Sequence, residues 1–252
     1  MCGRLISNLP VSTIADLLDA KPAEGVIEPR FNLAPRGIAP MVCVDKRPGS
    51  KDRGRRVLIP ATFAISVPEP AWKAIKKRRP AYDTRTEEVP SVKSSALKKA
   101  PWADLLHHRR GIVAVSGYYD WTVPHPNLPH HKHVHAVVRQ DGSPMLLACL
   151  YDDACEQRRG ADVRFSVVTV EAKGHEAAPN GWMPAILQSD DIVAWIGDAA
   201  AEHDLKQLSA LLRPAADGVL RRYRVANAVG NAANDGEWLL QPIDRVTAIK
   251  AA

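Results

Sequence analysis

The chain has 252 residues, with a hydrophobic fraction of 46%, a charged fraction of 25% and a formal net charge of +6. These values are typical of a globular protein, and they exclude a low-complexity chain and a small domain that needs disulfide staples to fold. The sequence has neither a long apolar run nor a signal-peptide pattern, which argues against a membrane span and predicts a cytoplasmic location.

The first half of the chain is predicted to combine one short helix with loops and strands. Residues 11–20 have the apolar spacing of an amphipathic helix, with Ser12 or Thr13 as its N-cap. The elements expected after it are a proline-punctuated loop from residue 31, a strand at 40–44, a basic turn at 45–56, a strand at 57–65 broken by Pro60, and a proline- and lysine-rich loop at 66–80. The cations in the turn and the loop would suit either a phosphate-tracking surface or a solvated loop.

The second half of the chain carries most of the predicted strands. Residues 91–106 are predicted to be helical with a break near Pro101, and residues 111–121 to form a buried strand. After a proline- and histidine-rich tip at 122–133, the segments 135–139 and 145–151 flank an Asp-Gly-Ser turn and predict a hairpin. The remaining expected elements are a strand at 164–170, helices at 189–197 and 202–212, and a strand at 220–227.

Many strands joined by short turns, with a few helices between them, predict an α+β fold. We expect a mainly antiparallel sheet or β-barrel-like core with flanking helices. No segment resembles a linker between two independent cores, so residues 1–252 are predicted to form a single domain.

Thiols and imidazoles offer two candidate sites. Cys149 and Cys155 could form a redox pair, and the alternative is scattered core thiols in a reducing compartment. The histidines that cluster along the chain are His125, His130, His131, His133 and His135. On a strand, the last three would share one face and could bind zinc, whereas a solvated hairpin tip is the alternative, because no carboxylate lies in this window. We expect no metal and no cofactor.

Cys2 is the most informative single residue. Removal of Met1 would leave its thiol and a free α-amine on adjacent carbons. This 1,2-aminothiol condenses with an aldehyde to an imine, and the thiol then closes a thiazolidine ring. Reference pKa values of roughly 8 for the amine and roughly 8.5 for the thiol leave both nucleophiles partly available near neutral pH. The cationic neighbour Arg4 would favour the thiolate. The alternative is that Cys2 is a small buried residue on a first strand.

A set of short strings occurs in order along nearly the whole chain, from Met1 to about Pro242. The strings are MCGR at 1–4, FNLAP at 31–35, DTRTE at 83–87, GYYDW at 117–121, VVTVEA at 167–172, WMPAIL at 182–187 and NAANDGEWLLQP at 231–242. In this order and spacing they resemble the SOS-response-associated peptidase (SRAP) family. The resemblance implies an α+β fold with a β-barrel-like core and a basic cleft for single-stranded DNA.

The resemblance also implies a reaction and a partner. Cys2 would trap the aldehyde of an abasic site in single-stranded DNA as a covalent thiazolidine crosslink. The nucleic-acid-binding residues that the resemblance implies are Arg4, Pro35, Arg85, Trp121 and Thr169. Arginines would hold the flanking phosphates, and the proline and tryptophan rings would line the cleft and support an unstacked base. We expect a monomeric, nucleoid-associated DNA-repair protein with no membrane partner.

Three positions depart from the family pattern. Asp83 stands where the family has Asn, Asp120 where it has Glu, and Asn180 where it has His. With Cys2, these are the candidate catalytic residues. Asn180 cannot transfer a proton as a histidine can, and Asp83 could supply acid–base function only if crowding raises its pKa. The alternative is drift after loss of catalysis. Our hypothesis is that Cys2 still crosslinks, while strand cleavage and crosslink release are slow.

Two rival functions remain open from the sequence. Cys2 could be the nucleophile of an N-terminal-cysteine peptidase or amidohydrolase, with its own amine as the base. Alternatively, the chain could be a catalytically inactive module that binds single-stranded DNA. The resemblance favours an enzyme that forms DNA–protein crosslinks, with abasic-site lyase-like activity and self-processing of its N-terminus.

Overall fold

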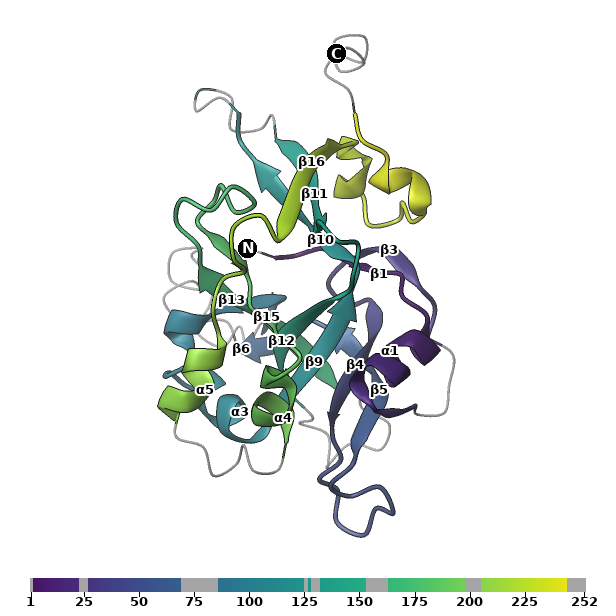
Figure 1. The fold of residues 1–252 in the computed structure, drawn as a ribbon, viewed down its shortest axis with the longest axis vertical. Coiled ribbons are helices and arrows are strands. Elements are labelled where there is room, and N and C mark those ends of the chain that lie inside the picture. The colour runs from purple at the N-terminus through teal and green to yellow at the C-terminus, as the bar shows by residue number, and fades with distance from the viewer. Residues whose placement is uncertain are drawn as a thin grey trace, which may run out of the picture.

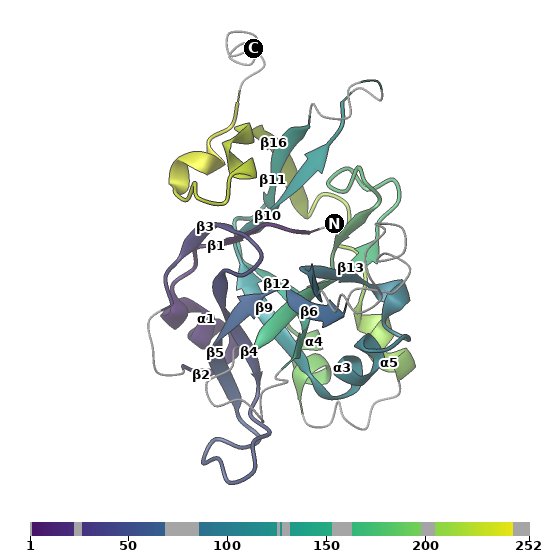
Figure 2. The same cartoon turned by 180° about the vertical axis from the view of Figure 1, so that it is seen from behind.

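A computed structural model describes residues 2–22, 27–68, 86–124, 127, 132–152, 163–197 and 205–243. Figures 1 and 2 show the fold from opposite sides. Some residues that the sequence singles out lie outside the described ranges: Met1, Asp83, Arg85, His125, His130, His131 and Cys155.

The larger of the two main sheets closes on itself. Its strands follow the order β14-β13-β12-β9-β4-β5-β2, with β15 beside β12 and β8 beside β13, and β13 also pairs with β5. That last pairing places Phe165 opposite Phe63 and joins β13, β12, β9, β4 and β5 into a ring. The strand bounds are β2 Lys21–Pro22, β4 Ile38–Val44, β5 Arg56–Phe63, β8 Ser91–Lys93, β9 Arg110–Val115, β12 Met145–Asp152, β13 Arg164–Glu171, β14 Trp182–Pro184 and β15 Ile186–Leu187.

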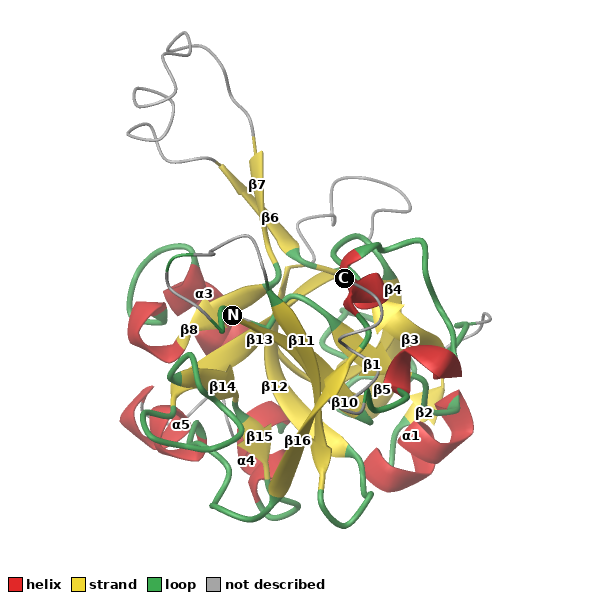
Figure 3. Ribbon diagram, turned by 90° about the horizontal axis from the view of Figure 1, so that it is seen from above, coloured by secondary structure: helices red, strands yellow, loops and turns green. Residues whose placement is uncertain are grey.

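The second main sheet is fully antiparallel and lies above one end of this ring (Figure 1). Its order is β16-β11-β10-β1-β3, with bounds β1 Leu5–Ser7, β3 Arg30–Leu33, β10 Gly117–Thr122, β11 His133–Arg139 and β16 Leu220–Val225. A separate ribbon of β6 (Ile65–Pro68) and β7 (Thr86–Val89) projects from the body (Figure 3). The prediction of an α+β fold with a mainly antiparallel, barrel-like core is confirmed.

Short helices flank the ring. Helices α3, α4 and α5 lie together on one side of it and α1 on the other (Figures 1 and 2). Their bounds are α1 Val11–Leu18, α3 Trp102–His108, α4 Asp191–Ile196 and α5 Leu205–Leu211, and the 3-10 turns are η1 Ser94–Ala96, η3 Asn227–Gly230 and η4 Glu237–Leu240. No helix in the described ranges has the length and apolar character needed to cross a bilayer.

The predicted hairpin around the Asp-Gly-Ser turn is wrong, because its two strands belong to different sheets. β11 pairs with β10, and β12 pairs with β9. The turn itself forms, with Gly142 at φ 73 and with the Asp141 carboxylate accepting hydrogen bonds from Arg139 and Ser143. A good local turn therefore does not establish which strands pair across it. The predicted strand at 111–121 likewise divides at Ser116 into β9 and β10.

Three local predictions also need correction. Residues 91–106 are not one helix, because β8 pairs in parallel with β13 and only α3 is helical. Pro60 does not break β5, since it lies opposite Pro40, and two facing prolines lose no ladder bond when the pair is a non-hydrogen-bonded one. Helix α1 begins after Pro10, and neither Ser12 nor Thr13 caps it through its side chain.

The two faces of the second sheet are buried against different apolar clusters. Leu5 of β1 and Tyr118 of β10 join the main core. Their chain neighbours Ile6 and Tyr119 join a smaller cluster with Val229 of η3. Because side chains alternate along a strand, Asp120 shares the face of Tyr118, toward the main core.

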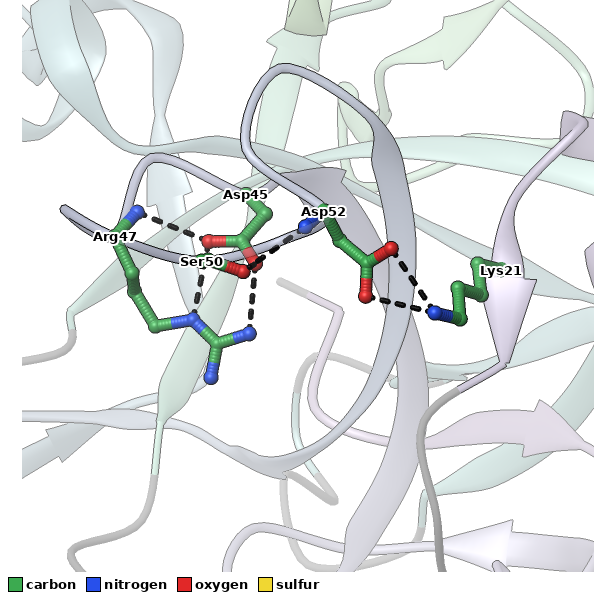
Figure 4. Close-up of polar contacts among 5 residues, drawn as sticks. All are labelled: Lys21, Asp45, Arg47, Ser50 and Asp52. Carbon is green, nitrogen blue, oxygen red and sulfur yellow. Dashed lines mark hydrogen bonds and ion pairs between the residues drawn. The ribbon is translucent and has the colours of Figure 1, made fainter.

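A carboxylate organises the basic turn after β4 (Figure 4). Asp45 accepts hydrogen bonds from the Arg47 guanidinium, the Arg47 backbone N–H and the Ser50 hydroxyl, and its side chain is 1% exposed. Lys21 pairs with Asp52 in the same loop at 2.9 Å. At least two of the cations in this region are therefore bound to acidic partners within the protein.

Asp45→Asn is expected to destabilise the protein in a pH-dependent way. Hydrogen bonding to Arg47 holds the pKa of Asp45 well below its usual range, so the carboxylate stabilises the fold above an unfolded-state pKa of about 3.9. That stabilisation is lost as the pH falls below this value. We expect the variant to lose about 1.5–3 kcal/mol of unfolding free energy at pH 7, measured by urea denaturation, and progressively less below about pH 4. An equal loss at pH 7 and pH 3 would contradict the charge-based explanation.

Candidate functional site

Cys2 lies at the start of the second sheet, just before β1. The register of β1 with β10 continues past its end, since the Tyr119 N–H donates to the Arg4 carbonyl at 3.1 Å. The Cys2 residue is 4% exposed and belongs to the main core. Burial raises the pKa of its thiol to about 12, and the negative charge of Asp120 acts in the same direction. At neutral pH the group is therefore a buried thiol beside a carboxylate.

Arg4 does not act on this thiol in the predicted way. Its guanidinium donates to the Asn32 side chain and to the Val229 carbonyl, both at 2.8 Å, and to the Gly230 carbonyl at 3.1 Å. These partners lie on the opposite face of β1, against the smaller cluster. The expected effect of the Arg4 cation on Cys2 is therefore not found, because the guanidinium binds the C-terminal segment. Arg4 lowers the pKa of the Cys2 thiol only through a hydrogen bond from its backbone N–H, and burial outweighs that contribution. Binding of a DNA phosphate by Arg4 stays a prediction.

Asp120 and Asn180 form a direct pair. The Asn180 Nδ2 group donates to Asp120 Oδ1 at 3.1 Å, to Asp120 Oδ2 at 3.2 Å and to the Trp121 carbonyl at 2.9 Å. Asp120 is 8% exposed and lies on β10, whereas Asn180 lies in the turn between β13 and β14. The turn is closed by Gly181 at φ 72, a conformation that favours glycine. The structure thus brings together three of the four predicted catalytic residues; Asp83 is not described.

Tyr118 is a component of this site that sequence reasoning missed. It lies two residues before Asp120 on the same face of β10, and its hydroxyl is buried without a hydrogen-bond partner among the described residues. Burial raises its pKa far above the usual value, and the charges of Cys2 and Asp120 add to the shift. The GYYDW string contained the signal, because alternate residues of a strand face the same side.

The neighbouring strand places a histidine opposite Asp120. His135 pairs in register with Asp120, and its Nδ1 lies 2.7 Å from Arg222 Nη2. Burial lowers the pKa of His135 to about 4, and the positive charges of Arg222, His133 and Arg224 contribute. The ring is neutral at pH 7, and its Nδ1 accepts from the guanidinium. Within the described ranges no three His, Cys, Asp or Glu side chains are grouped to hold a metal ion.

The other predicted DNA-binding residues differ in how accessible they are. Thr169 is 1% exposed, and its hydroxyl donates to the Val92 carbonyl at 3.2 Å, so it lies inside the barrel wall. Trp121 is half-buried against the smaller cluster, on the face of β10 opposite Asp120. Pro35 is half-buried in the turn after β3. Arg85 falls outside the described residues. Among the described residues, no hydrogen bond or ion pair joins the side chains of Thr169, Trp121 and Pro35 to the group around Cys2.

Two crystal structures show the same fold. A protein from Bacteroides thetaiotaomicron aligns with 96% of this chain and 100% of its own, at 14% identity and a TM-score of 0.69. A phage-related protein from Bordetella bronchiseptica aligns over 89% of this chain and 94% of its own, at 18% identity and a TM-score of 0.64. At these identities the likeness concerns the fold alone.

Sequence comparisons identify the family. A curated Saccharomyces cerevisiae protein, named Abasic site processing protein YMR114C, is 25% identical over 178 residues, which are 69% of this chain and 45% of that protein. The chain thus spans less than half the length of this relative. The sequence model of the SOS response associated peptidase (SRAP) family matches residues 1–232. Because the match covers most of the 252 residues, the chain belongs to the SRAP family.

Proposed function

We propose that this protein processes abasic sites in single-stranded DNA by forming a covalent crosslink through Cys2. The observation that carries the proposal is the burial of the Cys2 thiol beside Asp120 and Tyr118, just before β1. Membership of the SRAP family and the name of the yeast relative support the choice of an abasic site as the substrate.

The proposed reaction needs no oxidant and no cofactor. After removal of Met1, the Cys2 α-amine adds to the aldehyde carbon of the ring-opened abasic sugar. Loss of the aldehyde oxygen as water gives an imine. The sulfur then bonds to the imine carbon while the thiol proton passes to the nitrogen, which closes a thiazolidine. One carbon–nitrogen and one carbon–sulfur bond form, and one water leaves.

Asp120 would move the protons in this sequence. With a pKa of about 12, the thiol is almost wholly protonated at neutral pH, so ring closure requires a base close to the sulfur. Asp120 lies beside Cys2, and the amide of Asn180 holds both of its carboxylate oxygens. The unpartnered Tyr118 hydroxyl would donate to the sugar oxygen as that oxygen departs or rotates away.

The protein would release its product slowly, because Asn180 hydrogen-bonds but does not titrate. Reopening of the thiazolidine requires a proton donor and acceptor that works near neutral pH, a role for which histidine is suited. Asn180 lies at the position from which a side chain reaches both Asp120 oxygens. The proposed protein therefore holds the abasic site as a long-lived adduct.

Asn180→His is expected to accelerate crosslink release and strand cleavage while leaving crosslink formation within a few-fold of wild type. General acid–base groups typically contribute about 10²–10⁴-fold, so a gain of about 10-fold or more is expected. Release would be timed by chasing a purified adduct with excess unlabelled abasic DNA. Asn180→Gln, which adds length without a titratable group, is the matched control. Equal release rates for the two variants would contradict the role given to residue 180.

The proposed function is tested by intact mass. Purified protein that has lost Met1 is incubated with a single-stranded oligonucleotide containing one abasic site. The expected product has the summed mass of protein and DNA less one water, and it survives heating. The same oligonucleotide without the abasic site should give no adduct. Reversible DNA binding without any adduct would instead identify a binding module, and cleavage of an amide substrate would identify a hydrolase.

A further inference from the structure

The face of the second sheet that carries Asp120 continues across β11 to a pair of arginines on β16. His135 pairs with Arg224, and Val137 pairs with Arg222. Because residues two apart on a strand face the same side, both arginines share the face of His135 and Asp120. Two strand spacings, about 10 Å, separate β10 from β16.

These two arginines retain unused donors. The Nε atoms of Arg222 and Arg224 are both buried and have no hydrogen-bond partner among the described residues. Arg222 uses Nη2 to contact His135 at 2.7 Å and Thr122 at 3.4 Å, which are neutral groups. A buried charged donor without an acceptor is unfavourable, so such groups point to an acceptor that arrives with a ligand.

No carboxylate in the described part of the chain forms an ion pair with this cluster. None of the ion pairs between described residues involves Arg222 or Arg224. Asp120 is close enough to affect Arg222 electrostatically, but both of its oxygens accept from Asn180. Burial is the main cause of the depressed pKa of His135, and the positive charges of Arg222, His133 and Arg224 add to it. The cluster therefore has a positive charge in excess.

We propose that Arg222 and Arg224, with His135 beside them, form a binding site for an internal phosphodiester of the DNA strand close to the reacting nucleotide. A guanidinium offers parallel N–H donors that match two oxygens of a phosphate group. The site lies on the face that carries Tyr118 and Asp120, so one strand of DNA could contact both. The identity of the ligand as a DNA strand rests on the proposed function, whereas the binding of a phosphate group rests on the arginine donors alone.

The test is the salt dependence of reversible binding to DNA that has no abasic site. A fluorescent single-stranded oligonucleotide without terminal phosphates is titrated at several sodium chloride concentrations with wild type, Arg222→Gln and Arg224→Gln. Each variant should bind more weakly, and its slope of log affinity against log salt should fall by about 0.7, the value for one phosphate contact in single-stranded DNA. Arg222→Lys and Arg224→Lys, which keep the charge, should recover most of that slope.

Arg221→Gln is the matched control. Arg221 directly precedes Arg222 on β16, is exposed and lies over the Tyr223 ring on the other face. The Arg221→Gln substitution removes the same charge and should leave the slope of log affinity against log salt near the wild-type value. An equal fall in all three glutamine variants would overturn the site, because it would reflect only net charge. Unchanged slopes for Arg222→Gln and Arg224→Gln, or a slope that the lysine variants do not recover, would also overturn it.

Two further outcomes distinguish an internal phosphodiester from a terminal phosphate, and distinguish failure of the phosphate site from failure of the proposed crosslinking function. Repeating the titrations with a 5′-phosphorylated oligonucleotide should give the same difference between variants and wild type. A loss confined to that oligonucleotide would overturn the assignment to an internal diester. If the slopes change as expected but wild type forms no adduct with abasic DNA, the phosphate site stands and the proposed crosslinking function fails.

Discussion

Cys2→Ala is expected to abolish the heat-stable adduct with abasic single-stranded DNA completely. Alanine keeps the α-amine, so an imine can still form, but no sulfur is present to close the ring. Imines hydrolyse in water, and the adduct would be lost on heating. Adduct formation would be followed by denaturing electrophoresis and intact mass, with removal of Met1 verified for each protein.

Cys2→Ser and borohydride separate the two nucleophiles of the proposed reaction. Cys2→Ala and Cys2→Ser should each give a stable adduct only when borohydride reduces the imine, whereas wild type needs no reductant. Cys149→Ala, at another buried thiol of the main core, should crosslink like wild type. A heat-stable adduct of Cys2→Ala without borohydride would show that another residue forms the bond.

Asp120→Asn is expected to slow crosslink formation by about 10²–10⁴-fold, the usual contribution of a positioned acid–base group. The reason lies in the thiol. Burial raises the pKa of this thiol to about 12, so the thiolate is scarce at pH 7 and ring closure depends on a nearby base. Asparagine has nearly the same shape as aspartate but cannot take up the proton. The measurement is the single-turnover rate with protein in excess over abasic DNA.

Asp120→Glu provides the control for this prediction. It keeps the carboxylate and restores the residue that the family pattern has at this position, so crosslinking should stay within about 10-fold of wild type. Reversible binding to DNA without an abasic site should change little in either variant, which would place the effect on chemistry. If Asp120→Asn crosslinks at the wild-type rate, ring closure does not depend on this carboxylate.

The parts of the fold that could be predicted are those in which local pattern and pairing agree. Residues 164–170 and 220–227 read as strands, and β13 and β16 confirm them. The hairpin around Asp141 could not be predicted correctly, because its turn is sound while its strands enter different sheets. Pairing is a non-local property, and a turn constrains only the residues that flank it.

Only part of the candidate site could be predicted, because its contacts also join residues far apart in the sequence. The Asp120–Asn180 contact joins residues 60 positions apart, and a motif resemblance could place both in one site, as it did. It could not show that Arg4 turns to the opposite face, because its partners near Val229 are set by the tertiary fold. The places of Tyr118 and Arg222 depend on burial and on register across three strands, which no local pattern gives.

The burial of Cys2 has a consequence for the order of events during synthesis. The strand that covers it, β10, begins at Gly117, and the carbonyls that anchor Arg4 belong to Val229 and Gly230. While the ribosome is still making these segments, β1 can pair only with β3, and Cys2 lacks its neighbours on β10. A methionine aminopeptidase would therefore act during translation, when Cys2 is still accessible. Chains that escape this processing would fold with Met1 still attached to the buried Cys2, without the free amine that the proposed reaction needs.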